Sequence, residues 1–119
     1  MSTRATIHFE QTYGNPEAIV YRHFDGYPEG LGNALEEFLD ESQMSDRDPM
    51  FDQPKYLAAR WVAWDILRDH LTIYESTDTG IVLHDPPDIV YRYHMICRDE
   101  GQPEIVTEIY GDGDWRALK

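Results

Sequence analysis

Residues 54–71 carry the most regular hydrophobic pattern in the chain. Apolar side chains recur there at the i, i+4, i+7 spacing of one helical face: Leu57, Trp61, Trp64, Leu67 and Leu71. That face is widened by further apolar residues: Tyr56, Ala59, Ala63 and Ile66. Pro54 suits the first turn of a helix, because its missing N–H has no partner to lose there. The pattern predicts a helix over 54–71 whose broad apolar face is covered by the rest of the protein.

A second amphipathic pattern predicts a helix that begins at Pro28 or Leu31 and ends at Glu41. Its inner face consists of apolar residues: Leu31, Ala34, Leu35, Phe38 and Leu39. The outer face is almost entirely acidic and carries Glu36, Glu37, Asp40 and Glu41. Residues 42–53 then form a polar loop between the two helices.

Alternating apolar and polar side chains predict the strands. In residues 4–10, Ala5, Ile7 and Phe9 face one side, and the other side, which we expect to be solvated, carries Thr6, His8 and Glu10. Further strands are predicted at 18–24, 81–83, 89–97 and 104–110, whereas 111–115 reads as a loop. The order β-β-α-α-β-β-β predicts an α+β fold, in which two helices pack on one face of an antiparallel sheet of about five strands.

Length and composition favour one soluble domain over residues 1–119. The chain has 119 residues, of which 41% are hydrophobic and 13% aromatic, enough for a core of its own. No apolar run is long enough to span a membrane, and the N-terminus lacks the apolar stretch of a secretion signal. Cys97 is the single cysteine, so we expect a cytoplasmic protein in which it fills the core.

Charge is the most unusual property of the sequence. Asp and Glu number 23 against 10 Lys and Arg, which gives a formal net charge of −13. Direct binding to nucleic acid or to an anionic membrane is disfavoured because phosphates would be repelled, so a partner should be basic. Between residues 25 and 52 the only base is Arg47, against nine acids that we predict to bind the partner: Asp25, Glu29, Glu36, Glu37, Asp40, Glu41, Asp46, Asp48 and Asp52.

Catalytic and metal-binding signatures are absent from the local sequence. No two histidines have the H-x-x-x-H spacing of a helical zinc site, and no hydrolase, phosphate-loop or dinucleotide motif is present. We therefore expect no catalytic residues, no metal and no cofactor. The alternative is a small ligand-binding or catalytic site centred on Arg22, His23, Asp25 and Tyr27, which Arg92 and His94 would join if their strands are neighbours.

Residues 21–30, Tyr-Arg-His-Phe-Asp-Gly-Tyr-Pro-Glu-Gly, followed by Leu-Ala-Ala-Arg-Trp at 57–61, resemble small proteins of unknown function carried by phages and mobile elements of bacteria. Similar short acidic proteins from that source include anti-CRISPR inhibitors, some of which mimic DNA. The resemblance implies a non-enzymatic inhibitor whose acidic face occupies the positively charged nucleic-acid channel or PAM-recognition surface of a host CRISPR effector. A third reading is a salt-adapted acidic domain without mimicry.

Overall fold

A six-stranded sheet and two α-helices make up the computed structural model, which describes residues 3–69 and 79–118. The first half of the chain contains β1 (Ala5–Thr12), β2 (Asn15–Arg22), the helical turn η1 (Pro28–Gly32), α1 (Asn33–Met44) and α2 (Pro54–Asp69). The second half contains β3 (Thr79–Val82), β4 (Tyr91–Ile96), β5 (Glu104–Gly111) and β6 (Asp114–Ala117). The predicted α+β class is therefore confirmed, with η1 and α1 in place of the single helix predicted after Pro28.

The strands are arranged in the order β3-β2-β1-β4-β5-β6. Every neighbouring pair is antiparallel except the central one, in which β1 and β4 run parallel. The prediction of an antiparallel sheet is thus wrong at its centre. Pairing between strands that lie on either side of the helical hairpin depends on tertiary contacts, which the alternation within each strand does not contain.

The sixth strand, β6, lies where the sequence was read as a loop. Its hairpin with β5 turns through Asp112 and Gly113, whose φ angles are 53° and 80°. Positive φ at both central residues matches the right-handed twist of the flanking strands, and Asp-Gly is a favoured pair for such a turn. Trp115 is held by the hairpin, with its ring centroid 5.3 Å from that of Tyr110.

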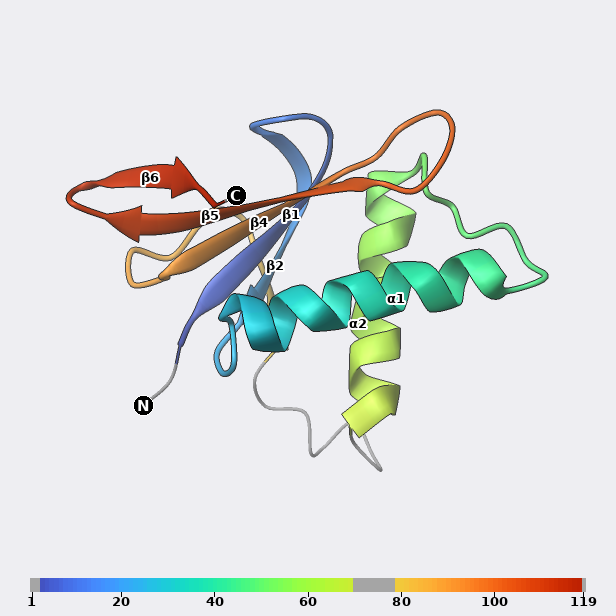
Figure 1. Cartoon of the computed structure of the whole chain (residues 1–119), viewed down its shortest axis with the longest axis horizontal. Helices are drawn as coiled ribbons and strands as arrows, with labels where there is room; N and C mark the ends of the chain where they lie inside the picture. Colours follow the sequence, from blue (N-terminus) through green and yellow to red (C-terminus); the bar gives the residue numbers. More distant parts are fainter. Residues whose placement is uncertain (1–2, 70–78, 119) are drawn as a thin grey trace.

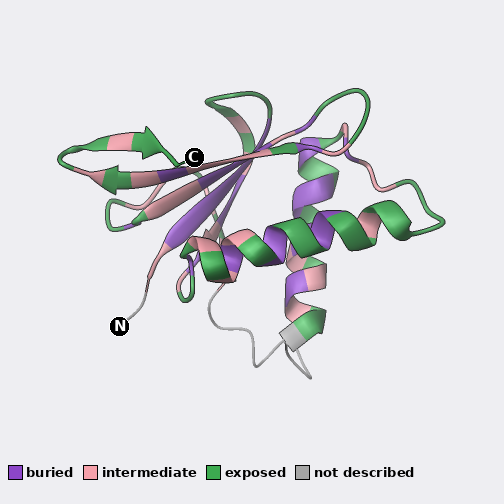
Figure 2. Cartoon of the chain, viewed as in Figure 1, coloured by how far each residue is buried: buried purple, intermediate pink, exposed green. Residues whose placement is uncertain are grey.

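Both helices lie against one face of the sheet, as predicted, and cross each other there (Figure 1). The core forms between that face and the helices, where Phe38 of α1 meets Trp61 of α2 edge-to-face with ring centroids 5.5 Å apart. The sheet contributes Ile7 and Phe9 of β1 and Tyr93 of β4, all fully buried. Figure 2 shows that burial is concentrated in β1, at the centre of the sheet.

The face of α2 differs from the predicted one. Leu57 and Trp61 are fully buried, but Leu67 is 78% exposed. The inner face instead continues to Asp65, whose Oδ1 accepts a hydrogen bond of 2.6 Å from Arg22. A paired charge thus occupies the position one turn beyond Trp61, while predicted core residue Leu71 lies outside the described residues. Within the described part of the chain, neither helix has the length and apolar character to cross a membrane.

Candidate functional site

The acidic side chains of α1 point away from the core. Glu36, Glu37, Asp40 and Glu41 are all exposed, because the inner face of α1 is occupied by apolar residues. Among the described residues, only Glu37 of these four forms an ion pair, at 3.1 Å from Arg68 of α2. Glu41 accepts a hydrogen bond of 3.3 Å from the indole N–H of Trp64. The helix therefore presents carboxylates that the protein's own cations leave mostly unneutralised.

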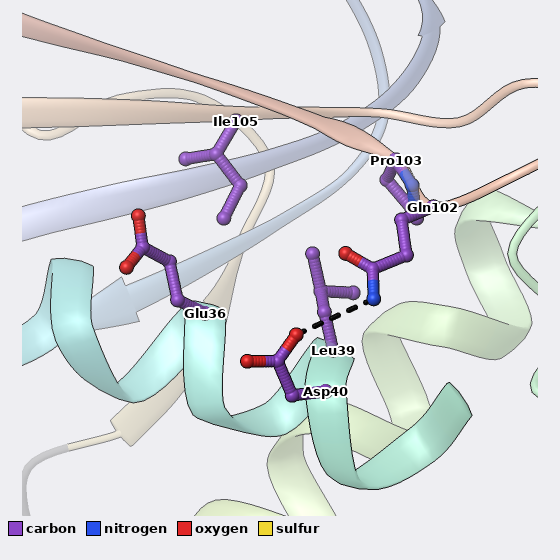
Figure 3. Close-up of a pocket in the computed structure, with 6 residues that line it drawn as sticks. All are labelled: Glu36, Leu39, Asp40, Gln102, Pro103 and Ile105. Atoms are coloured by element: carbon purple, nitrogen blue, oxygen red, sulfur yellow. Dashed lines mark hydrogen bonds between the residues drawn. The ribbon is translucent and has the colours of Figure 1, made fainter. Parts of the chain in front are cut away.

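Glu36 and Asp40 lie on the side of α1 that faces β5, beside a hollow of about 320 Å³ (Figure 3). The surface of this hollow is mainly polar, and the apolar residues Leu39, Pro103 and Ile105 contribute a smaller part of it. Gln102 completes the rim, and its side-chain N–H₂ donates to Asp40 Oδ1 at 3.4 Å. A pair of carboxylates at a polar hollow can accept hydrogen bonds from the cationic tip of a lysine or arginine side chain.

The other predicted acids lie before and after α1 in the chain. Asp25 and Glu29 line a separate hollow before α1, together with Arg22 and Arg68. Asp46, Asp48 and Asp52 follow α1, and the last two line a third hollow with Arg98 and Asp99. The nine acids are thus divided into three groups in chain order, and each group has a base beside it, which in the middle group is Arg68 at Glu37.

The alternative site residues do not converge. Arg22 pairs with Asp65 beneath α2, whereas His23 Nδ1 contacts the Tyr21 hydroxyl at 2.8 Å. Asp25 lines the same hollow as Arg22 but accepts from the Tyr27 hydroxyl only at 3.4 Å. The suggestion that Arg92 and His94 join this group is wrong, because they lie on the opposite face of the sheet from Arg22.

That opposite face, called the outer face below, is buried at its centre. The sequence predicted a solvated side for Thr6, His8 and Glu10, yet Thr6 and Glu10 are 0% exposed and His8 is 6% exposed. The prediction is wrong because residues 83–90, which connect β3 to β4, pass over this face, and Asp85 contacts β1 directly. Burial of these polar groups requires partners for their hydrogen-bonding atoms.

Asp85 supplies several of those partners. Its Oδ1 accepts from the Thr6 hydroxyl at 2.6 Å and contacts His8 Nε2 at 2.7 Å, while Oδ2 accepts from Arg92 at 3.3 Å. Burial raises the pKa of Asp85, but these hydrogen bonds outweigh burial and lower the pKa from 3.8 to about 2. Asp85 therefore stays ionised at neutral pH.

Glu108 of β5 occupies the other end of the same cluster. It accepts hydrogen bonds from Arg92 Nε at 2.8 Å and from the Tyr13 hydroxyl at 2.6 Å, and it contacts His94 Nε2. Burial raises the pKa of Glu108, yet these contacts prevail and lower it from 4.5 to about 2. The guanidinium of Arg92 lies over the ring of Trp115, 4.4 Å from its centroid.

His8, Glu10 and His94 form the centre of the cluster. His8 and His94 are paired in the parallel register of β1 and β4, and their ring centroids are 5.1 Å apart. His94 Nδ1 contacts Glu10 Oε1 at 2.6 Å, and the Gly14 N–H donates to the same oxygen at 3.0 Å. One nitrogen or oxygen from each of the three residues lies within 4.8 Å of the others, which is a donor set of two imidazoles and one carboxylate.

Part of this cluster has a signal in the sequence. His8 and Glu10 are two residues apart on a strand, so alternation alone places them on one face. His94 is more than 80 residues away, and only the pairing of β1 with β4 brings it alongside. Motifs defined by short spacing along the sequence do not detect such a group.

Cys97 lies on the helix-facing side of the sheet and is 4% exposed. Burial raises the pKa of its thiol to about 12, so the reactive thiolate is not formed at neutral pH. Its place in the core agrees with the prediction that it is a packing residue.

Comparison with known proteins gives no match: no family model fits the chain, and neither curated proteins nor solved structures show significant similarity to it. Function therefore has to follow from the chain's own residues.

Proposed function

We propose that this protein is a non-enzymatic binding protein that uses the acidic side of α1 to occupy a basic surface on another macromolecule. The supporting observation is the hollow beside Glu36 and Asp40, where two carboxylates without an ion-pair partner in the described chain lie side by side in a mainly polar wall. An arginine or lysine from a partner would place its charge beside the carboxylates and its stem against Ile105, which is partly exposed.

The distribution of charge also supports a partner that normally binds nucleic acid. The acids of α1 lie between Glu36 and Glu41, a rise of about 8 Å along which acidic side chains can replace neighbouring phosphates. Carboxylates spaced four residues apart repel each other within a helix, so the arrangement costs stability that a basic partner would return. Residues 21–30 and 57–61 resemble small phage-borne proteins of unknown function. Because short acidic proteins from that source include anti-CRISPR inhibitors, we take a CRISPR effector as the candidate partner.

A displacement assay tests this proposal. A purified CRISPR effector–guide RNA complex is loaded with a labelled target DNA duplex, and the protein is added at increasing concentration. We expect the wild type to displace the DNA. A variant with Glu36→Gln, Glu37→Gln, Asp40→Asn and Glu41→Gln should displace it at least ~10-fold less effectively, because the charges that match the basic channel are lost.

A matched control separates position from net charge. A control variant removes an equal number of negative charges elsewhere on the surface, through Glu17→Gln, Asp88→Asn, Asp112→Asn and Asp114→Asn. This variant should displace the DNA as effectively as the wild type. Equal displacement by the α1 variant and the wild type would contradict the proposal. Absence of displacement by the wild type would remove the CRISPR effector as the partner.

A further inference from the structure

The buried donors of His8, Glu10 and His94 form a group that the acidic side of α1 does not explain. They lie on the outer face of the sheet, whereas both helices cover the other face. All three are at least nine-tenths buried, with exposures of 6%, 0% and 2%. Side chains of this polarity are seldom buried together unless they bind one another or a ligand.

Two atoms of the group have no partner. His8 Nδ1 and Glu10 Oε2 are buried without a hydrogen bond, and they are the only buried side-chain nitrogen or oxygen atoms in this condition among the described residues. An unsatisfied buried polar atom costs about 1–3 kcal/mol. Both atoms belong to the three clustered residues, so the unpaired buried polar atoms of the described chain occur at one place in the fold.

Outer carboxylates orient both imidazoles in the same way. His8 Nε2 contacts Asp85 Oδ1 at 2.7 Å, and His94 Nε2 contacts Glu108 Oε1. When each Nε2–H donates to its carboxylate, His8 Nδ1 can present a lone pair, and His94 Nδ1 can do so once the proton in its contact with Glu10 Oε1 is lost. Histidines that bind metals usually donate their second ring N–H to a carboxylate or a carbonyl in this manner.

The charge of the cluster favours a divalent cation. Glu10, Asp85 and Glu108 contribute three negative charges as carboxylates, and Arg92 contributes one positive charge. Metal binding requires both histidines to be neutral, and in that state the cluster would carry two net negative charges, which one divalent ion would balance. Two imidazoles and a carboxylate suit Zn²⁺ and its transition-metal neighbours, whereas Mg²⁺ and Ca²⁺ prefer oxygen ligands alone.

We propose that Nδ1 of His8, Nδ1 of His94 and the carboxylate of Glu10 bind a divalent transition-metal ion of the Zn²⁺ type. The ion would replace the direct contact between His94 Nδ1 and Glu10 Oε1 and would supply the partner that His8 Nδ1 and Glu10 Oε2 lack. Ligand atoms of a tetrahedral zinc ion lie about 3.3 Å apart. One donor atom from each of the three residues lies within 4.8 Å of the others, so the side chains would have to move closer together around the ion. This site departs from the sequence prediction that the chain binds no metal.

Titration with Co²⁺ tests the site, because protein-bound Co²⁺ in a low-coordinate nitrogen and oxygen site has characteristic visible absorption. The full chain is freed of metal with EDTA, transferred to chelator-free buffer and titrated, and Zn²⁺ is then added in competition. We expect one Co²⁺ per chain, displaced by Zn²⁺ and unaffected by excess Mg²⁺.

Three single variants remove one ligand each: His8→Gln, Glu10→Gln and His94→Gln. Each should weaken Co²⁺ binding by more than the roughly 100-fold that loss of an outer partner can cost. His8→Gln is the sharpest of them, because the glutamine amide keeps a donor for Asp85 while removing Nδ1. Circular dichroism and a reversible unfolding transition in EDTA establish that each variant is folded.

A double variant, His23→Gln with His84→Gln, is the matched control, since both histidines lie outside the cluster and neither is buried. It should bind Co²⁺ within ~2-fold of the wild type, because loss of metal affinity is expected only from ligands and their outer partners. Failure of the folded wild type to take up one saturable Co²⁺ would overturn the proposal. So would unchanged affinity in folded His8→Gln and Glu10→Gln, or a loss confined to the control. Should His94→Gln fail to fold, the other two variants decide.

Discussion

At the scale of single residues, Asp85 connects neighbouring strands on the outer face of the sheet. Its two oxygens connect Thr6 and His8 of β1 to Arg92 of β4, so one carboxylate fixes residues 83–90 across the parallel strand pair. Ionised Asp85 is the form that these donors stabilise, and its lowered pKa expresses that preference. Glu108 has the same role toward Arg92, Tyr13 and His94.

Acid should therefore destabilise the protein through these two groups. A carboxylate with a lowered folded pKa contributes stability above its unfolded pKa and loses it as the pH falls toward the folded value. For Asp85 and Glu108 the loss extends from about pH 5 to about pH 2, and Asp85 contributes on the order of 2 kcal/mol of it. Urea unfolding in EDTA at pH 7, 5 and 3 measures the effect.

Asp85→Asn is the variant that isolates this contribution. It should be less stable than the wild type at pH 7 and should lose less on acidification, so the two curves converge at low pH. Curves that stay parallel from pH 7 to pH 3 would show that ionised Asp85 does not hold this face together.

At the scale of elements, α2 shows how far a hydrophobic pattern determines packing. The pattern located the helix and its first buried residues, Leu57 and Trp61, because the 3.6-residue period is intrinsic to the sequence. It failed at Leu67, which is exposed. Asp65 occupies the inner position on that turn of α2 because it pairs with Arg22 of β2. An ion pair between two elements can thus decide which side of a helix is buried, and the sequence of the helix alone does not reveal it.

Two truncations on α2 distinguish the predicted face from the observed one. Trp61→Ala should lower the free energy of unfolding by about 3–5 kcal/mol, because it leaves a cavity against Phe38. Leu67→Ala should change that free energy by no more than about 0.5 kcal/mol, because the side chain is exposed. Denaturant unfolding of both variants provides the comparison, and similar losses for the two would restore the face predicted from the pattern.

The strands show the same limit for the candidate site. Alternation correctly placed Thr6, His8 and Glu10 on one side of β1, and the turn-forming Asp112-Gly113 pair was available as a hairpin signal for β6. Whether that side of β1 is wet depends on the path of residues 83–90, and the proximity of His94 depends on parallel pairing with β4. Both are properties of the tertiary fold, so sequence reasoning missed the buried cluster.

At the scale of the whole molecule, the two faces of the sheet carry different features. Helices cover one face and present exposed carboxylates to solvent, whereas the other face holds a buried group of histidines, carboxylates and Arg92. The acidity of the region from Asp25 to Asp52 was readable from the sequence, but its division into three groups was not. Proposed partner binding depends on the first face alone.

The association rate with the effector–guide RNA complex, measured as a function of salt, is the most direct test of the role of α1. Exposed charges that guide association speed it at low salt and are screened as salt rises. We expect a steep fall of the wild-type rate with increasing salt, and a much shallower one for the variant neutralised at Glu36, Glu37, Asp40 and Glu41. The same slope in both proteins would contradict the account, because it would place the guiding charges elsewhere.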